Sequence, residues 1–187
     1  MNGDRSTVTI QIERQLKNEW CWAAVSASVH KFFRGIAQTQ CQIAATVLKQ
    51  QCCDPAFSGQ CNLAQPLHPI LDSFGVLKAG DPISRQLTFD EVRTEIDAGR
   101  PCCVLIKWLT NGEVGSDGHY IAINGYRVTP ANRQFVSISD PLFSDSECDF
   151  TEFTSAKGGY HDGRGVWTMT YRLVHPRVQP GVQSATL

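Results

Sequence analysis

Residues 15–24 read QLKNEWCWAA, and this stretch decides the fold that we expect. A glutamine stands six residues before Cys21, and Cys21 opens a segment whose apolar residues recur at helical spacing. A Gly-His-Tyr run follows at residues 118–120 and a Ser-Asp-Pro run at residues 139–141. The chain therefore carries, in this order, an amide, a thiol, an imidazole and a carboxylate, the groups that a cysteine nucleophile needs around it.

Each of these residue types has a task in nucleophilic catalysis. A free cysteine is only a few per cent thiolate at neutral pH, and a helix N-terminus and an adjacent imidazolium both favour the thiolate. Cys21 stands where the helix should begin, so its sulfur would face the unpaired N–H groups of the first turn. His119 would pair with the thiolate and later protonate the leaving group, while Asp140 would orient the imidazole. The Gln15 amide and the Cys21 backbone N–H would hold a developing oxyanion.

At these residues the chain resembles the papain-like cysteine peptidases. It is most similar to their compact bacterial branch, which includes AvrRpt2-type effector proteases and peptidases related to the bacteriocin-processing enzymes. The matching pieces are Gln15 with residues 21–24, the Cys-Cys…Cys-Asn loop at 52–62, Gly-His-Tyr at 118–120 and Asp-Pro at 140–141. The resemblance covers roughly residues 10–174, most of the chain. The resemblance implies that Cys21 is the nucleophile, His119 the base, Asp140 the orienting acid and Gln15 the oxyanion donor.

The sequence departs from the plant and lysosomal members of that family. Those enzymes carry small residues before the nucleophile, whereas Glu19 and Trp20 precede Cys21 here. They also orient the histidine with asparagine, where this chain offers Asp140. His119 follows Cys21 by 98 residues, against roughly 130–150 in those enzymes. We therefore expect a compact version of the fold.

The order of secondary-structure patterns predicts an α+β fold. Helices are predicted at residues 22–33, 39–50, 63–74 and 88–98, and strands at 8–12, 102–108, 120–128, 134–139 and 166–173. The resemblance implies one papain-like domain over residues 1–174, with a helical lobe at about 13–100 that contains a central nucleophile helix. A C-terminal antiparallel sheet would form the second lobe at about 101–174, with the cleft between the two. Residues 1–7 and 175–187 are predicted to be tails, and 115–118 a flexible segment.

Composition excludes several classes of function. The 187 residues are 42% hydrophobic and 19% charged, as in an ordinary globular protein. The net charge of −1 gives no broad positive potential that would attract nucleic acid or a membrane surface. Its apolar runs are too short to span a bilayer, and the N-terminus lacks the pattern of a signal peptide. We expect a monomer that is synthesised in the cytoplasm, needs no cofactor or metal, and would leave the cell as an effector only by another route.

Other histidines compete with His119 for the role of base. His161, in the run GGYHDG, is the serious rival because a glycine-rich loop could line the cleft. The remaining histidines lie in helical patterns or in the predicted tail: His30, His68 and His175. His119 is favoured because it precedes a clear strand pattern, which would back the imidazole rigidly at the lobe boundary.

The other site residues also have plainer interpretations. Cys21 could be a buried packing thiol, and Gln15 an ordinary solvated side chain. Asp140 could merely form a turn before Pro141. Asp117 and Asp145 are alternatives to Asp140, but they lie in predicted loops.

The eight cysteines leave several arrangements open. Without a signal peptide the default is reduced thiols, and Cys102 and Cys103 read as small hydrophobic residues of a strand. After export, a disulfide could join Cys61 to one member of the Cys-Cys pair at 52–53. Metal binding is a further alternative, with Cys41 and Cys148 completing a set of four ligands, although the spacing does not match common zinc sites.

These observations predict a hydrolase, a cysteine endopeptidase that acts on a limited set of protein or peptide substrates through a thioester on Cys21. One alternative uses the same triad for deamidation, transglutamination or acyl transfer on a protein side chain. A second is a catalytically silent binding module. If the protein is a toxin, a producing cell would need an inhibitor or immunity protein.

Overall fold

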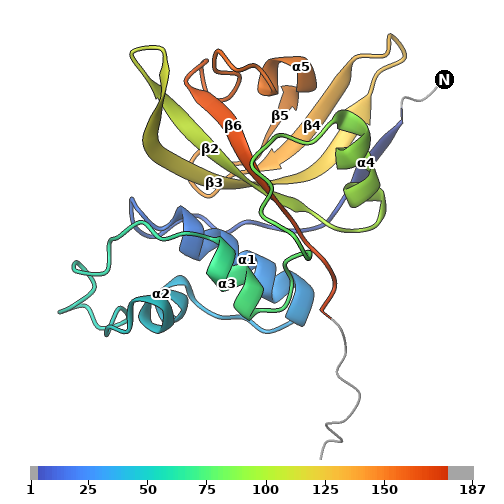
Figure 1. Cartoon of the computed structure of the whole chain (residues 1–187). Coiled ribbons are helices and arrows are strands. Elements are labelled where there is room, and N and C mark those ends of the chain that lie inside the picture. The colour runs from blue at the N-terminus through green and yellow to red at the C-terminus, as the bar shows by residue number, and fades with distance from the viewer. Residues whose placement is uncertain (1–3, 177–187) are drawn as a thin grey trace, which may run out of the picture.

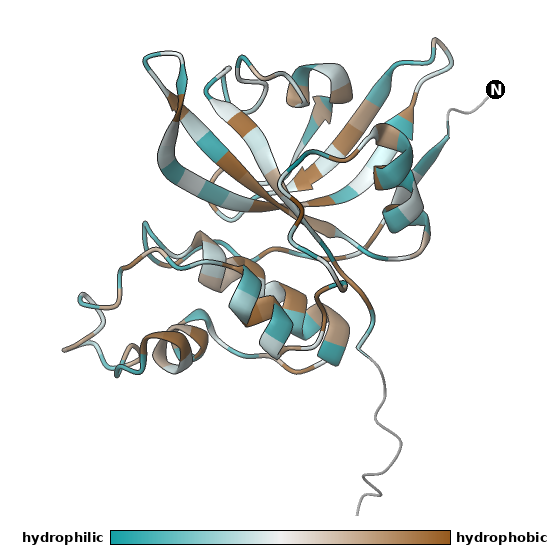
Figure 2. Cartoon of the chain, viewed as in Figure 1, coloured by the Kyte–Doolittle hydropathy of each residue, from teal (hydrophilic) through white to brown (hydrophobic). Residues whose placement is uncertain are grey.

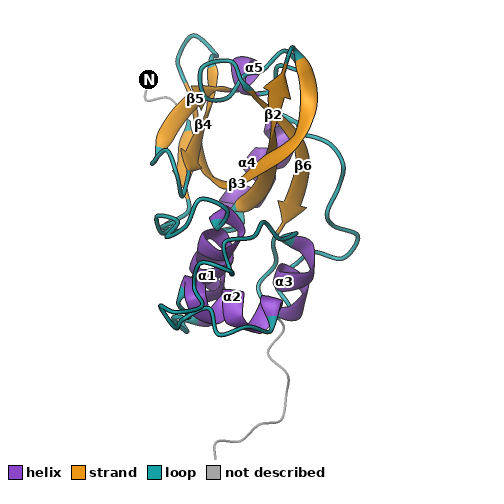
Figure 3. Ribbon diagram, turned by 90° about the vertical axis from the view of Figure 1, so that its left-hand side faces the viewer, coloured by secondary structure: helices purple, strands orange, loops and turns teal. Residues whose placement is uncertain are grey.

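A computed structural model describes residues 4–176. One group of helices packs beneath a strongly curved antiparallel sheet, and two further helices lie on the other side of the sheet (Figure 1). The view turned by 90° shows the same two layers, with the sheet curling over the helices (Figure 3). The predicted tail at 175–187 lies mostly outside the described residues. None of the helices between residues 4 and 176 combines the length and the apolar character needed to cross a membrane.

Helix α1 is the centre of the helical layer. It spans Cys21–Arg34, and its first nine residues are all buried, so it is covered on every side rather than along one stripe. It ends at Gly35, whose φ of 68° supplies the left-handed cap that a glycine adopts without a steric penalty. The other helices are α2 (Gln40–Leu48), α3 (His68–Ser73), α4 (Phe89–Asp97) and the short α5 (Phe150–Phe153).

The strands form one antiparallel sheet in the order β5-β4-β3-β2-β6, with β1 added to β3. Their bounds are Arg5–Thr7 for β1, Cys102–Thr110 for β2, Glu113–Val128 for β3, Gln134–Ser139 for β4, Ser146–Asp149 for β5 and Gly165–Arg172 for β6. Asn111 and Gly112 join β2 to β3, and both have positive φ, as a two-residue hairpin turn requires. The central strand β3 therefore has β2 on one side and β4 on the other.

Hydrophobic residues fill both faces of this sheet. One cluster joins α1 and α3 to the underside of the sheet, through residues such as Val25, Val29 and Leu71. The other lies on the opposite face, where Phe89 and Val92 of α4 pack against the strands. Figure 2 shows the apolar positions of α1 and of the strands in the same arrangement. Helix α4 thus packs on the sheet, although its residues fall within the range expected for the helical lobe.

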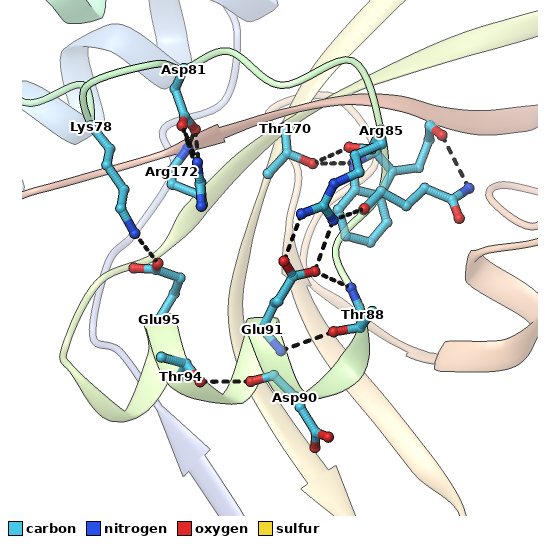
Figure 4. A network of polar contacts seen from close by, with 12 residues as sticks. Lys78, Asp81, Arg85, Thr88, Asp90, Glu91, Thr94, Glu95, Thr170 and Arg172 are labelled. Atoms are coloured by element: carbon cyan, nitrogen blue, oxygen red, sulfur yellow. Dashed lines mark hydrogen bonds and ion pairs between the residues drawn. The ribbon is translucent and has the colours of Figure 1, made fainter.

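An ion-pair network ties the segment between α3 and α4 to β6 (Figure 4). The side chain of Asp81 is fully buried and accepts hydrogen bonds from the guanidinium of Arg172 at 2.7 Å and from its backbone N–H at 2.6 Å. Glu95 of α4 is also buried and pairs with Lys78 at 3.1 Å and Arg100 at 2.6 Å. Removing the Arg172 side chain would leave the buried Asp81 carboxylate without its cationic partner, which destabilises strongly. This network fixes the sheet edge farthest from β5.

The predicted α+β class, with helices packed on an antiparallel sheet, is confirmed. The strand at 134–139 is found with the predicted bounds, and the helix predicted at 88–98 begins with a capping box of Thr88 and Glu91. Several local predictions were wrong. Residues 5–7 form a strand rather than a tail, residues 8–12 are not a strand, and 115–118 belong to β3 rather than to a flexible loop. The third helix covers only His68–Ser73, and the short elements β5 and α5 carry too little periodicity to be recognised.

Candidate active site

Cys21 is the first residue of α1 and is 7% exposed. The residue before it, Trp20, is the N-cap, and its side chain accepts no hydrogen bond from the N–H groups of the first turn. The first turn also holds no acidic residue. The first N–H groups of the helix therefore keep their capacity to stabilise a negative charge at the Cys21 sulfur. Placement of the thiol at a helix N-terminus agrees with the sequence analysis.

His119 and Asp140 reach the site from neighbouring strands. His119 lies within β3, Asp140 directly follows β4, and the register pairs Ala122 with Ser139. His119 Nε2 is 2.9 Å from Asp140 Oδ1, and both residues are 4% exposed. The imidazole and the carboxylate therefore form a buried hydrogen-bonded pair, as the sequence analysis expects.

Asp140 is held by four hydrogen bonds. Its Oδ1 also accepts from the backbone N–H groups of Leu142 at 2.6 Å and Phe143 at 2.8 Å. These two bonds form an Asx-type turn directly after the end of β4. Its Oδ2 accepts from the Tyr160 hydroxyl at 2.6 Å. Sequence reasoning missed Tyr160, although it stands next to His161, the histidine that was weighed as a rival base.

The pKa shifts of His119 and Asp140 favour the charged form of each residue. Burial works against the imidazolium of His119, but hydrogen bonds with Asp140 and then Cys21 outweigh it and raise the pKa of His119 to about 9. Burial also opposes the charge on Asp140, yet the hydrogen bond with His119 and further donors lower its pKa. Burial and the adjacent Asp140 charge raise the pKa of Tyr160, so its hydroxyl stays a donor. Because Nε2 is occupied by Asp140, Nδ1 is the nitrogen left to face the Cys21 thiol.

Gln15 is close to this group but is engaged elsewhere. Its backbone N–H donates to the Pro141 carbonyl at 2.9 Å, which ties residue 15 to the turn after Asp140. Its Nε2 donates to the carbonyls of Lys17 at 2.9 Å and Asn18 at 2.8 Å. Among the described residues its buried Oε1 has no partner. The amide would have to release one carbonyl before it could donate to an oxyanion.

A cleft of about 600 Å³ lies over Cys21 and His119. Its walls come from both layers, so the expected meeting of a helical and a sheet wall is found. The helical side supplies Asn18, Glu19, Cys21, Trp22 and residues 64–66, and the sheet side supplies Leu105, Lys107, Trp108, residues 116–120 and Leu142.

Two disulfides hold the loop that leads to residues 64–66. They join Cys41 to Cys53 and Cys52 to Cys61. The default prediction of reduced thiols is therefore wrong for these four residues. One of the two pairings, Cys61 with a member of the Cys-Cys pair, was among the predicted alternatives. The pairing of Cys41 was not, because spacing alone cannot assign disulfide partners.

The same loop is bonded to the start of α1. The Trp20 indole donates to the Cys61 carbonyl at 2.7 Å, and the Trp22 indole donates to the Leu63 carbonyl at 2.9 Å. The Asn62 side chain accepts from the Glu19 backbone N–H at 3.0 Å. The nucleophile and the opposite cleft wall are thus built on one cross-linked unit.

Two of the remaining candidates, His161 and Asp117, make no hydrogen bond to His119 or Asp140. His161 stacks on Phe143, with ring centroids 3.7 Å apart, and makes no hydrogen bond to a described carboxylate. Asp117 lines the cleft mouth, and its carboxylate accepts from Ser116 rather than from an imidazole. Between residues 4 and 176 no group of side chains could hold a metal ion, in contrast to the alternative of a four-cysteine site.

Comparisons with known proteins identify the family and the fold. The model of the Peptidase C39-like family matches residues 7–172. Digestive procathepsin L 3 of Tenebrio molitor larval midgut has a TM-score of 0.51 and 9% identity, over 91% of this chain and 69% of that one. The ragweed cysteine protease Amb a 11, in its proform, has a TM-score of 0.50 and 14% identity, over 92% of this chain and 65% of that one.

A third similar structure is a double glycine motif protease from an AMS/PCAT transporter in complex with the leader peptide. Its TM-score is 0.48 at 14% identity, over 93% of this chain and 99% of that one. At such identities the structural similarity concerns the fold alone, and the fold is papain-like. A search of curated proteins with this sequence found no match.

Proposed function

Because the chain belongs to the Peptidase C39-like family and is a cysteine peptidase with a papain-like fold, we propose that it hydrolyses internal peptide bonds with Cys21 as nucleophile. The observation that carries the proposal is one buried chain of hydrogen bonds. It runs from Tyr160 through Asp140 to His119, whose raised pKa has the Cys21 thiol among its causes. This series of hydrogen bonds ends at the cleft, which Cys21 and His119 line.

The first half of the reaction forms a thioester. The Cys21 thiolate attacks the scissile carbonyl carbon, a C–S bond forms, and the carbonyl electron pair moves to the oxygen. When the tetrahedral species collapses, the C–N bond breaks and the Nδ1 proton of His119 moves to the departing amine. Asp140 keeps Nε2 hydrogen-bonded throughout, so the imidazole stays oriented as its charge changes.

The second half reverses these roles. Neutral His119 takes a proton from a water molecule, and the water oxygen attacks the thioester carbon. The C–S bond then breaks, a carboxylic acid leaves, and the thiolate–imidazolium pair is restored. The oxyanion of each step would be held by the Cys21 backbone N–H, which has no partner within the helix, and by Gln15 after its amide has released the Lys17 or Asn18 carbonyl.

The finer biological role is part of the same proposal. We expect a limited set of protein targets, export as an effector, and a partner inhibitor or immunity protein in cells that make the protein. Lining of the cleft by both the helical and the sheet side supports binding of an extended segment between them.

A mass-spectrometric digest of a mixed peptide library tests the proposal. The wild-type protein should produce pairs of fragments that share one cut position, and Cys21→Ala and His119→Ala should produce none while remaining folded. A mass change on a side-chain amide without any cut would favour a deamidase or acyltransferase instead. Equal activity of Cys21→Ala would contradict the assignment of the nucleophile.

A further inference from the structure

Trp108 lines two hollows at once. It borders the cleft over Cys21, and it also borders a second hollow of about 300 Å³. The other walls of this second hollow are Leu109, Phe143, His161 and Arg164. We infer that it is a subsite for an acidic residue of the substrate, on the leaving-group side of the scissile bond. This inference rests on the proposed function.

The position of His119 decides which part of a substrate reaches this hollow. The imidazole must hand its proton to the departing amine, so the chain on the amine side leaves Cys21 across His119. The ring of Trp108 stacks on His119, with centroids 6.0 Å apart and planes at 21°. A chain that passes over His119 therefore meets Trp108 next, and beyond Trp108 lies the second hollow.

The back wall of the hollow is rigid before any substrate binds. The Arg164 carbonyl accepts from the Leu109 backbone N–H at 2.8 Å, which pins the turn before β6 to β2. A Cβ at Gly158 would lie 2.1 Å from the Gly163 carbonyl oxygen, so this turn closes on itself with no room for a side chain. His161 is held at a φ of 47° with its ring stacked on Phe143. A pre-organised wall of this kind lowers the ordering cost of binding.

Arg164 gives the hollow its charge preference. Within residues 4–176 its side chain makes no hydrogen bond or ion pair, and its neighbour Asp162 does not line the hollow. Other arginines of the chain are paired with carboxylates: Arg85, Arg93, Arg100, Arg127, Arg133 and Arg172. An exposed, unpaired guanidinium beside aromatic walls suits a carboxylate, which it can bind through two parallel hydrogen bonds. Charge complementarity thus favours aspartate or glutamate.

Matched peptides test this preference. The acyl-side sequence and the cut position come from the library digest, and the leaving-side residue that reaches the hollow is then varied between Glu, Gln and Lys. Wild-type kcat/KM should be about threefold to tenfold higher for Glu than for Gln, as for an exposed to partly shielded ion pair. In Arg164→Glu the order of kcat/KM values should reverse, with the Lys peptide cleaved best. In Arg164→Gln the three peptides should have similar kcat/KM values.

Two controls separate this inference from the proposed function. A substrate with the same acyl side and a dye amine as leaving group has no residue for the hollow, so its cleavage by wild type reports the proposed peptidase activity without the subsite. Arg5→Glu, in a strand that lines neither hollow, should keep the preference for Glu. Equal cleavage of the three peptides by a wild-type protein that cleaves the dye substrate would overturn the subsite alone. Failure of wild type on every substrate would overturn the proposed function as well.

Discussion

Replacing Asp140 by asparagine removes a charge from the site while leaving its shape. The amide oxygen of the introduced asparagine can still accept from His119 Nε2 and from the N–H groups of Leu142 and Phe143, which now meet Oδ1. The amide nitrogen takes the place of Oδ2, and the Tyr160 hydroxyl can turn to accept from it. We therefore expect D140N to fold and to keep the imidazole oriented.

The charge loss should appear in the pH profile. The pKa of His119 is about 9 with Asp140 ionised, so the imidazolium that protonates the amine is present below that pH and is lost as the pH rises through it. A hydrogen bond to a charged partner exceeds a neutral one by about 1–1.5 kcal/mol, which corresponds to roughly one pKa unit. The alkaline limb of kcat/KM in D140N should therefore fall about one unit lower.

Rates of peptide cleavage across pH, for wild type, D140N and His119→Ala, would check this. D140N should lose about tenfold only above about pH 9 and little at neutral pH, where a His119 pKa of about 8 still leaves most of the imidazole protonated. Its loss at neutral pH should be far smaller than that of His119→Ala, which removes the proton donor itself. An unmoved alkaline limb in D140N would show that the Asp140 charge does not set the His119 pKa. Equal losses of activity in D140N and His119→Ala would show that an oriented imidazole gives no catalysis without the negative charge of Asp140.

Three further changes have expected outcomes. Tyr160→Phe removes a buried hydrogen bond to the Asp140 carboxylate and should lower the free energy of unfolding by about 1.5–3 kcal/mol in urea melts; an unchanged midpoint would argue against that bond. Gln15→Ala should reduce kcat about 100-fold to 1000-fold if the amide serves the oxyanion, and should leave kcat unchanged if the amide stays on its two carbonyls. A Cys52→Ala, Cys61→Ala double variant should lose about 2–3 kcal/mol of stability, and full retention would mean that this bond is absent in solution.

The sequence predicted the candidate site residues better than the residues that hold them in place. That Cys21, His119 and Asp140 lie close together was predictable, because each stands at the start or end of a strong periodic pattern in the sequence. Their catalytic roles remain a prediction. Tyr160 was not, because its contact with Asp140 depends on how the turn before β6 folds over β4. The neighbouring glycines in GGYHDG were the available signal, since they mark a turn close to a functional loop.

The same limits apply to the fold. Long periodic segments such as α1 and β4 were predictable, whereas β1 is the polar tripeptide Arg-Ser-Thr, whose pairing with β3 exists only in the assembled sheet. The link from Cys41 on α2 to Cys53 likewise depends on where the loop after α2 returns. Pairings between distant segments are set by tertiary packing, which local sequence does not encode.

Alkylation by iodoacetamide, followed at each cysteine by peptide mass over a range of pH, tests the central assignment most directly. Cys102 and Cys103 are internal controls, because burial raises the pKa of both thiols. The thiolate–imidazolium pair predicts that Cys21 reacts well below pH 7 in the native protein and loses that reactivity in His119→Ala. If Cys21 instead gains reactivity only near pH 8.5, like an ordinary thiol, in both proteins, no such pair exists and the account of the site is wrong.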